Sequence, residues 1–170
     1  MDPLDHWARH VLSLLDGDPQ PFLDGCRNDA QTVLDLVFDY AAAGYRAEAL
    51  GLLELHHANP IAPCAVPNPL GRSQMTRYAK AWLSGDTADL AGARKQSPDY
   101  FSPSRPHEQM VLEWALAQPG GDPLAAYGMG NFCYDQRRHD EALAHWETAA
   151  TALNPQAHRN LGLARWNVSR

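Results

Sequence analysis

The chain has 170 residues, of which 45% are apolar and 9% aromatic, and its formal net charge is -6. This length and composition are typical of a globular domain that buries a core without disulfides or metal, and they exclude a disordered chain. The acidic balance argues against a nucleic-acid partner, because nucleic-acid-binding surfaces normally concentrate basic residues.

The three cysteines, Cys26, Cys64 and Cys133, lie far apart and form no C-x-x-C pair. This number and spacing match neither a disulfide framework nor a zinc site, which favours a reducing compartment. No apolar run approaches the roughly 18 residues of a membrane span, and the N-terminal residues are too polar for a signal peptide. We therefore expect a cytoplasmic protein that has no membrane partner.

Apolar residues recur at spacings of three and four along the chain and strand signals are almost absent, so the sequence predicts an all-α fold. In the first helix, Trp7, Val11, Leu14 and Leu15 form the apolar face. About nine to ten helices are expected. They cover 3–15, a short stretch that carries Phe22, Leu23 and Cys26, then 30–43, 45–57, 71–83, 87–95, 105–117, two within 122–155, and 156–167.

Capping residues and prolines mark where helices begin and end. Asn28 or Asp29, Ser104 and Asp122 are candidate N-caps, the last followed by a first-turn proline. Four prolines exclude a helix over 60–69, which is the one long loop that the sequence predicts. No boundary separates independent domains, because each hairpin would expose an apolar face without its neighbour. We expect a single domain over 1–170.

The stretch 122–167 resembles one tetratricopeptide (TPR) unit followed by the first helix of another. The residues that carry the resemblance are Met129-Gly130, Phe132, Tyr134, Ala142, Trp146, Pro155 and Asn160-Leu161-Gly162. Gly130 and Ala142 allow two helices to approach closely, and Trp146 fills the groove to the next unit. The sequence departs from the family pattern at Ala126, at Cys133 and at Arg137-Arg138, which replaces the usual glycine turn.

The resemblance implies an α-solenoid, a TPR-like stack of antiparallel helical hairpins. Looser hairpins are expected over 1–60 and 68–117, the best-marked repeat over 122–155 and a half repeat over 156–167. The blocks DYAAAGYRAEAL, SPDYFSPSRPHEQMVLEWAL and YGMGNFCYDQRRHDEALAHWE are also similar to the C-terminal helical region of large bacterial proteins. In those proteins TPR-like helices follow a carbohydrate-enzyme-like β-sandwich, which implies that any catalytic sandwich lies outside this chain.

TPR arrays bind extended peptides on the concave face formed by the first helix of each hairpin, so the resemblance implies a protein or peptide partner. The outward positions would be Leu124, Tyr127, Asn131, Tyr134 and Asp135 in one unit, and Arg159, Asn160, Leu163, Trp166 and Asn167 in the next. Asn131 and Asn160 match the two asparagines of the family's carboxylate clamp, but Tyr127 stands where a lysine is needed. This disfavours a clamp. The two asparagines bond either a peptide backbone or each other's helices.

A second candidate surface is the aromatic and proline-rich loop that contains Tyr100, Phe101, Arg105 and His107. One interpretation is a plug that packs between neighbouring hairpins. The other is a contact surface for a fused or partner domain, on which Arg105 binds a carboxylate or a sugar hydroxyl.

The C-terminal edge is a third candidate surface. The last helix has no second helix after it to cover Leu161, Leu163 and Trp166, and leaving a large apolar side chain exposed forgoes roughly 1.5–3 kcal/mol. We therefore expect this edge to pair with a partner, with a second copy of the chain in a homodimer, or with further sequence of the same protein.

Catalytic and metal-binding patterns are weak. The cysteines have no motif, and the acidic residues fall at positions expected to face solvent. His6 and His10 lie four residues apart on one helix and can chelate a metal, but no third ligand is apparent, so neither a metal nor a cofactor is expected. The sequence favours a non-catalytic interaction scaffold or accessory module. The alternative is the helical part of a carbohydrate-processing enzyme that completes a site on a separate β-sandwich.

Overall fold

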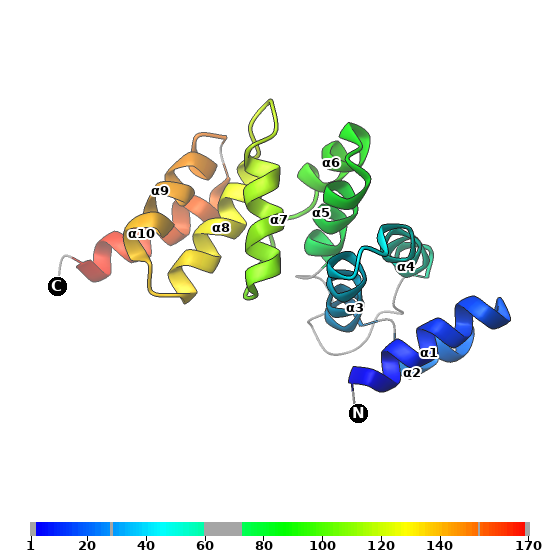
Figure 1. The fold of residues 1–170 in the computed structure, drawn as a ribbon. Helices are drawn as coiled ribbons and strands as arrows, with labels where there is room; N and C mark the ends of the chain where they lie inside the picture. Colours follow the sequence, from blue (N-terminus) through cyan, green and yellow to red (C-terminus); the bar gives the residue numbers. More distant parts are fainter. Residues whose placement is uncertain (1–2, 28, 60–72, 153, 169–170) are drawn as a thin grey trace. The chain divides into compact units, whose positions relative to one another are not determined.

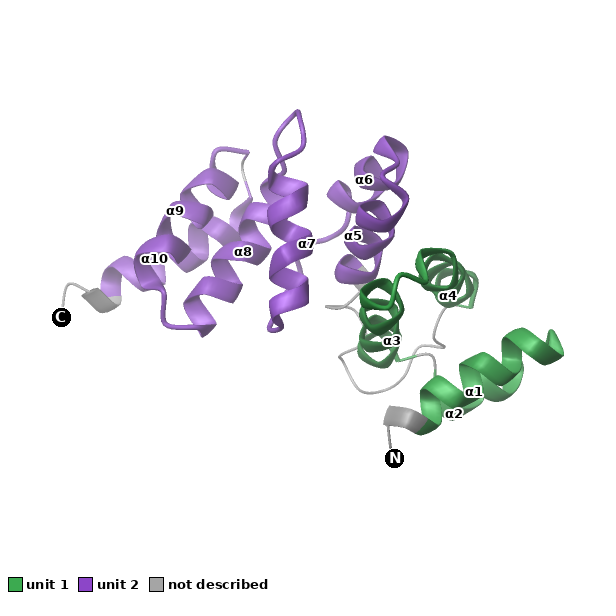
Figure 2. Cartoon of the chain, in the orientation of Figure 1, with its two compact units in different colours: residues 1–69 green, residues 70–170 purple. Residues whose placement is uncertain are grey.

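The computed structural model describes residues 3–27, 29–59, 73–152 and 154–168, which contain ten α-helices and no β-strand (Figure 1). The all-α prediction is thereby confirmed for this part of the chain, while the TPR-like stacking stays a prediction. The chain divides into two compact units, Met1–Pro69 and Leu70–Arg170 (Figure 2). The boundary lies at the end of the loop predicted over 60–69, which is outside the described residues. A single domain over 1–170 stays a prediction.

Unit 1 contains α1 (Pro3–Asp16), α2 (Gln20–Cys26), α3 (Ala30–Ala42) and α4 (Arg46–Ala58). α1 packs on α2, and α3 packs on α4. Of the two candidate caps of α3, Asn28 lies outside the described residues, and Asp29 accepts a hydrogen bond from the Thr32 backbone N–H at 2.9 Å. This local bond satisfies one of the backbone donors that the first turn of a helix leaves without a partner.

α1 leaves its apolar face exposed. The exposed fractions are 45% for Trp7, 54% for Leu14 and 76% for Leu15, whereas His10 and Ser13 are buried. The Nδ1 atom of His10 lies 2.8 Å from the Tyr40 hydroxyl oxygen, and the His10 ring makes edge contacts with Phe22 and Tyr40. The helix therefore packs through the polar side next to the predicted apolar stripe.

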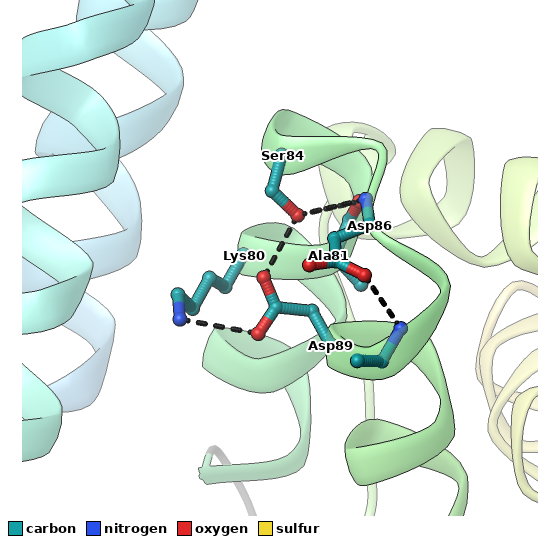
Figure 3. A network of polar contacts seen from close by, with 6 residues as sticks. Lys80, Ala81, Ser84, Asp86 and Asp89 are labelled. Atoms are coloured by element: carbon teal, nitrogen blue, oxygen red, sulfur yellow. Dashed lines mark hydrogen bonds and ion pairs between the residues drawn. The ribbon is translucent and has the colours of Figure 1, made fainter.

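Unit 2 contains α5 (Ser73–Ser84), α6 (Thr87–Arg94), α7 (Pro106–Leu116), α8 (Pro123–Asp135), α9 (His139–Ala150) and α10 (Pro155–Val168). The turn from α5 to α6 is held by its own polar side chains (Figure 3). Asp86 caps α6 by accepting from the Ala88 N–H at 2.7 Å. Asp89 accepts from the Ser84 hydroxyl at 2.8 Å and from Lys80 Nζ at 3.1 Å.

Asp122 connects three helices of unit 2, and its predicted role as the cap of α8 is confirmed. One carboxylate oxygen accepts from the Ala125 N–H at 2.9 Å and from the Tyr78 hydroxyl of α5 at 2.8 Å. The other accepts from Arg94 Nε of α6 at 3.2 Å. Burial together with this carboxylate raises the pKa of Tyr78, so its hydroxyl stays a proton donor.

α8 is buried on almost every side, and every residue from 124 to 130 has little exposure. Two glycines explain how neighbours come so close. A Cβ added at Gly128 would lie 2.4 Å from the Phe101 ring, and one added at Gly130 would lie 2.3 Å from Trp146 Cδ1. The close approach predicted at Gly130 is therefore observed, and the side chain against it is Trp146, which the sequence had assigned to the groove of the next unit.

Candidate functional site

The loop before α7 is anchored in unit 2 by Phe101. Its ring is 1% exposed, stacks on Tyr78 with centroids 6.1 Å apart and covers Gly128. The preceding residue, Tyr100, is 66% exposed and has a φ of 58°. The prediction that Phe101 is a contact residue is wrong, because the ring fills the space that Gly128 leaves. The plug interpretation holds for Phe101.

The other predicted residues of this loop, Arg105 and His107, are exposed at the start of α7. The candidate cap Ser104 does not cap the helix with its side chain. Instead, the buried Glu108 carboxylate accepts from the Ser104 N–H at 2.7 Å and the Arg105 N–H at 3.0 Å. This carboxylate fixes the end of the loop on α7.

Asn131 of α8 is the centre of a hydrogen-bond network between four segments of unit 2. Its Oδ1 accepts from Trp146 Nε1 of α9 and from Asn160 Nδ2 of α10, each at 3.0 Å. Its Nδ2 donates to the Phe101 carbonyl at 2.7 Å. Of the two interpretations left open by the sequence, the structure shows the asparagines bonding each other's helices.

A pocket of about 300 Å³ lies over this network, between α8 and α10. Its lining residues are Ser102, Asn131, Tyr134, Asp135, Trp146, Asn160, Leu163 and Ala164. The structure thus brings together Asn131, Tyr134, Asp135 and Asn160, which were predicted for the concave face, with Leu163, which was predicted for the C-terminal edge. Sequence reasoning missed Ser102 and Ala164, and it assigned Trp146 to packing alone.

Two residues predicted to face outward on α8 belong to its buried side. Leu124 is 5% exposed and Tyr127 is 8% exposed, so neither can form part of an open face. The reason is that α8 packs against α7 as well as α9, which leaves only its C-terminal turn accessible. The TPR pattern assumes that this side of the first helix is open.

On α10, the predicted residues divide between the surface and the interior. Leu163 is 53% and Trp166 60% exposed, as expected for an edge, and Arg159 is exposed outside the pocket lining. Leu161 is only 7% exposed, because this side of α10 packs on α9. The assignment of Leu161 to the edge is therefore wrong, and the side chain of Asn167 lies outside what the structure describes.

The rim of the pocket combines aromatic rings with one carboxylate. The Tyr134 ring contacts Trp146 at a centroid distance of 5.3 Å and His139 at 4.9 Å. Asp135 is exposed and, among the residues that the structure describes, makes only a hydrogen bond with Gln136 Nε2 at 3.2 Å. The site therefore presents a negative charge beside aromatic surface.

The cysteine and histidine residues considered for catalysis or metal binding do not line this pocket. Burial raises the pKa of the Cys133 thiol, which keeps it protonated and unreactive at neutral pH. His10 is buried against Tyr40. In the described segments no three His, Cys, Asp or Glu side chains gather closely enough to hold a metal ion. No helix among them has the length and apolar character needed to cross a bilayer.

Comparisons with protein-family models, with curated protein sequences and with solved structures found no match to this chain. The TPR resemblance and the likeness to bacterial β-sandwich proteins therefore stay predictions from the sequence.

Proposed function

We propose that the chain is a non-catalytic helical module that binds a segment of a partner protein in the pocket between α8 and α10. The observation that carries the proposal is the pocket itself, because its lining contains five side chains that were selected from the sequence for binding. Those residues come from two helices, and the first and last of them, Asn131 and Leu163, are separated by 32 positions in the sequence. Their meeting at one open surface supports a binding role.

The shape and chemistry of the pocket suit a peptide side chain. A volume of about 300 Å³ is at the small end of the range for ligand sites. Tyr134 and Leu163 are 40% and 53% exposed and give the rim an apolar surface, which Trp166 extends along α10. Aromatic anchors with an apolar neighbour are the kind of surface from which binding hot spots are built.

A peptide selection tests this proposal with a matched pair of leucine variants. Linear peptides are selected from a displayed random library on the wild-type chain, and the affinity of one selected peptide is measured by fluorescence anisotropy. Leu163→Ala should weaken binding by about tenfold, which corresponds to the loss of more than about 1 kcal/mol found when an important interface residue is truncated. Leu12→Ala is the control, because Leu12 is 55% exposed on α1, outside the pocket.

Circular dichroism should show unchanged helicity for both variants, since each side chain is more than half exposed. Equal affinity of both variants for every selected peptide would remove the pocket as the binding site. If no peptide is selected, sedimentation equilibrium tests the other expected occupant, a second copy that pairs through Leu163 and Trp166. Purely monomeric behaviour at high concentration would then exclude that homodimer too.

One observation favours a second candidate function, the completion of a carbohydrate-processing site on a separate β-sandwich domain. Tyr100 is exposed with a left-handed φ of 58°, a conformation that costs a non-glycine residue roughly 1–2 kcal/mol. Strained residues cluster at active sites and ligand clamps, and the exposed Arg105 and His107 follow this loop at the start of α7. The proposal requires a β-sandwich encoded in the same reading frame or beside it, and a gene region without one would eliminate it.

A further inference from the structure

The hydrogen-bond network beneath the pocket fixes which polar atoms face the ligand. An indole Nε1–H can only donate, so the Asn131 atom that faces Trp146 must be Oδ1. The amide nitrogen then donates to the Phe101 carbonyl, which can only accept. Asn160 must present its own Nδ2 to Asn131 Oδ1. The Trp146 donor therefore fixes the orientation of both amides.

This arrangement leaves acceptor oxygens at the pocket. Asn160 Oδ1 receives no hydrogen bond from any residue within the described segments, since this amide makes its hydrogen bond through Nδ2. Asp135 is the one charged residue among those that line the pocket, and no described residue forms an ion pair with it. By contrast, the nearby Glu141 and Glu147 are paired with Arg138 and Arg165.

Aromatic and aliphatic surfaces complete the lining. The Tyr134 ring is 40% exposed, and an aromatic ring face carries the negative side of the quadrupole, which attracts a cation placed over it. Leu163 and Ala164 offer an apolar wall for the methylene groups of a long side chain. A carboxylate, an amide oxygen, an aromatic face and an aliphatic wall together match the parts of a basic side chain.

We propose that the pocket between α8 and α10 binds an arginine side chain of the partner segment, and this inference rests on the proposed function. The planar guanidinium supplies several N–H donors to Asp135 and Asn160 and stacks on aromatic rings. Arg159 is exposed on α10 outside the lining, where it would meet an acidic neighbour of that arginine.

The probes are pools of peptides with degenerate flanking positions and one fixed central residue, which is Arg, Lys, Gln, Glu or Leu. Acetylated N-termini and amidated C-termini remove the terminal charges. The wild-type chain should retain the arginine pool about tenfold better than the glutamine pool, as expected for a charge-assisted contact. Asp135→Asn should abolish that preference, and Asp135→Lys should transfer it to the glutamate pool.

Asp140→Asn is the matched control, because Asp140 is an exposed aspartate in the first turn of α9 outside the lining and the variant removes the same charge. It should keep the arginine preference. An equal loss in both variants, or a wild-type preference for the leucine or glutamate pool, would overturn the inference while the pocket remains a binding site. Failure of all pools to bind would overturn the proposed function as well.

Discussion

α1 of unit 1 and α8 of unit 2 use their side chains in opposite ways. α1 has a well-defined stripe of large apolar residues, yet Leu14 and Leu15 are exposed and the buried contacts come from His10 and Ser13. α8 has glycines and alanines at many positions, yet its residues 124–130 are all buried. A regular apolar stripe predicts that a helix forms, but small residues determine how closely neighbouring helices can surround it.

A large effect is expected where α8 is packed most closely. Gly130→Ala would place a methyl group within 2.3 Å of the Trp146 indole, which is buried and bonded to Asn131. Overpacking of this kind costs about 1–3 kcal/mol of unfolding free energy. The measurement is urea denaturation of the whole chain, followed by tryptophan fluorescence.

Gly51→Ala is the control, since a Cβ at Gly51 in α4 meets open space. Alanine there should stabilise the chain by about 0.4–1 kcal/mol through its helix propensity and the smaller entropy of its unfolded state. If Gly130→Ala is as well tolerated as Gly51→Ala, the close packing of α8 on Trp146 is wrong.

A smaller effect is expected from the buried histidine of α1. Burial lowers the pKa of His10 in the folded chain below its ordinary value of 6.5. As the pH falls, the His10 imidazole is therefore protonated more readily in the unfolded chain than in the folded chain. Unit 1 loses stability as the pH falls below about 6.5, by at most about 1.4 kcal/mol of unfolding free energy per pH unit. Hydrogen exchange of the α1 and α3 amides measures the change.

His10→Gln removes the titrating group and keeps a polar partner for the Tyr40 hydroxyl. In this variant the amides of α1 and α3 should no longer show the loss of protection below about pH 6.5 that protonation of His10 causes. An identical pH dependence in both proteins would show that His10 does not control the stability of these helices.

The smallest effect is expected on the exposed stripe of α1. Leu14→Ala should change the unfolding free energy by no more than about 0.5 kcal/mol, because the side chain is 54% exposed. Leu34→Ala provides the contrast, since Leu34 in α3 is fully buried and its truncation should cost about 2–5 kcal/mol. A comparable loss at Leu14 would show that another part of the protein covers this stripe.

The helices were predictable because periodicity, capping residues and proline act locally. Asp122 was identified as a cap from the chain alone, Asp29 was one of two candidates for the cap of α3, and the predicted helix ends fall close to those observed. The direction in which α1 packs was not predictable, because His10 is buried through a partner 30 residues away, Tyr40. Periodicity contains no information about such a partner.

The pocket was predictable only in part. Asn131 and Asn160 were found from the repeat spacing, but their bonds depend on the Trp146 donor and the Phe101 carbonyl, which only the folded chain brings together. Tyr127 was placed wrongly because the family pattern leaves that side of the helix open, whereas α7 packs on α8 here. Spacing identified candidates, and tertiary packing decided which of them stayed accessible.

The Asp122 carboxylate also has a consequence for how unit 2 unfolds. Because it bonds Tyr78 of α5, Arg94 of α6 and the first turn of α8, none of these helices can separate from the others without leaving a buried charge or hydroxyl uncompensated. We expect the three helices to open together as one cooperative unit, so that their slowest-exchanging amides share a single free energy of opening.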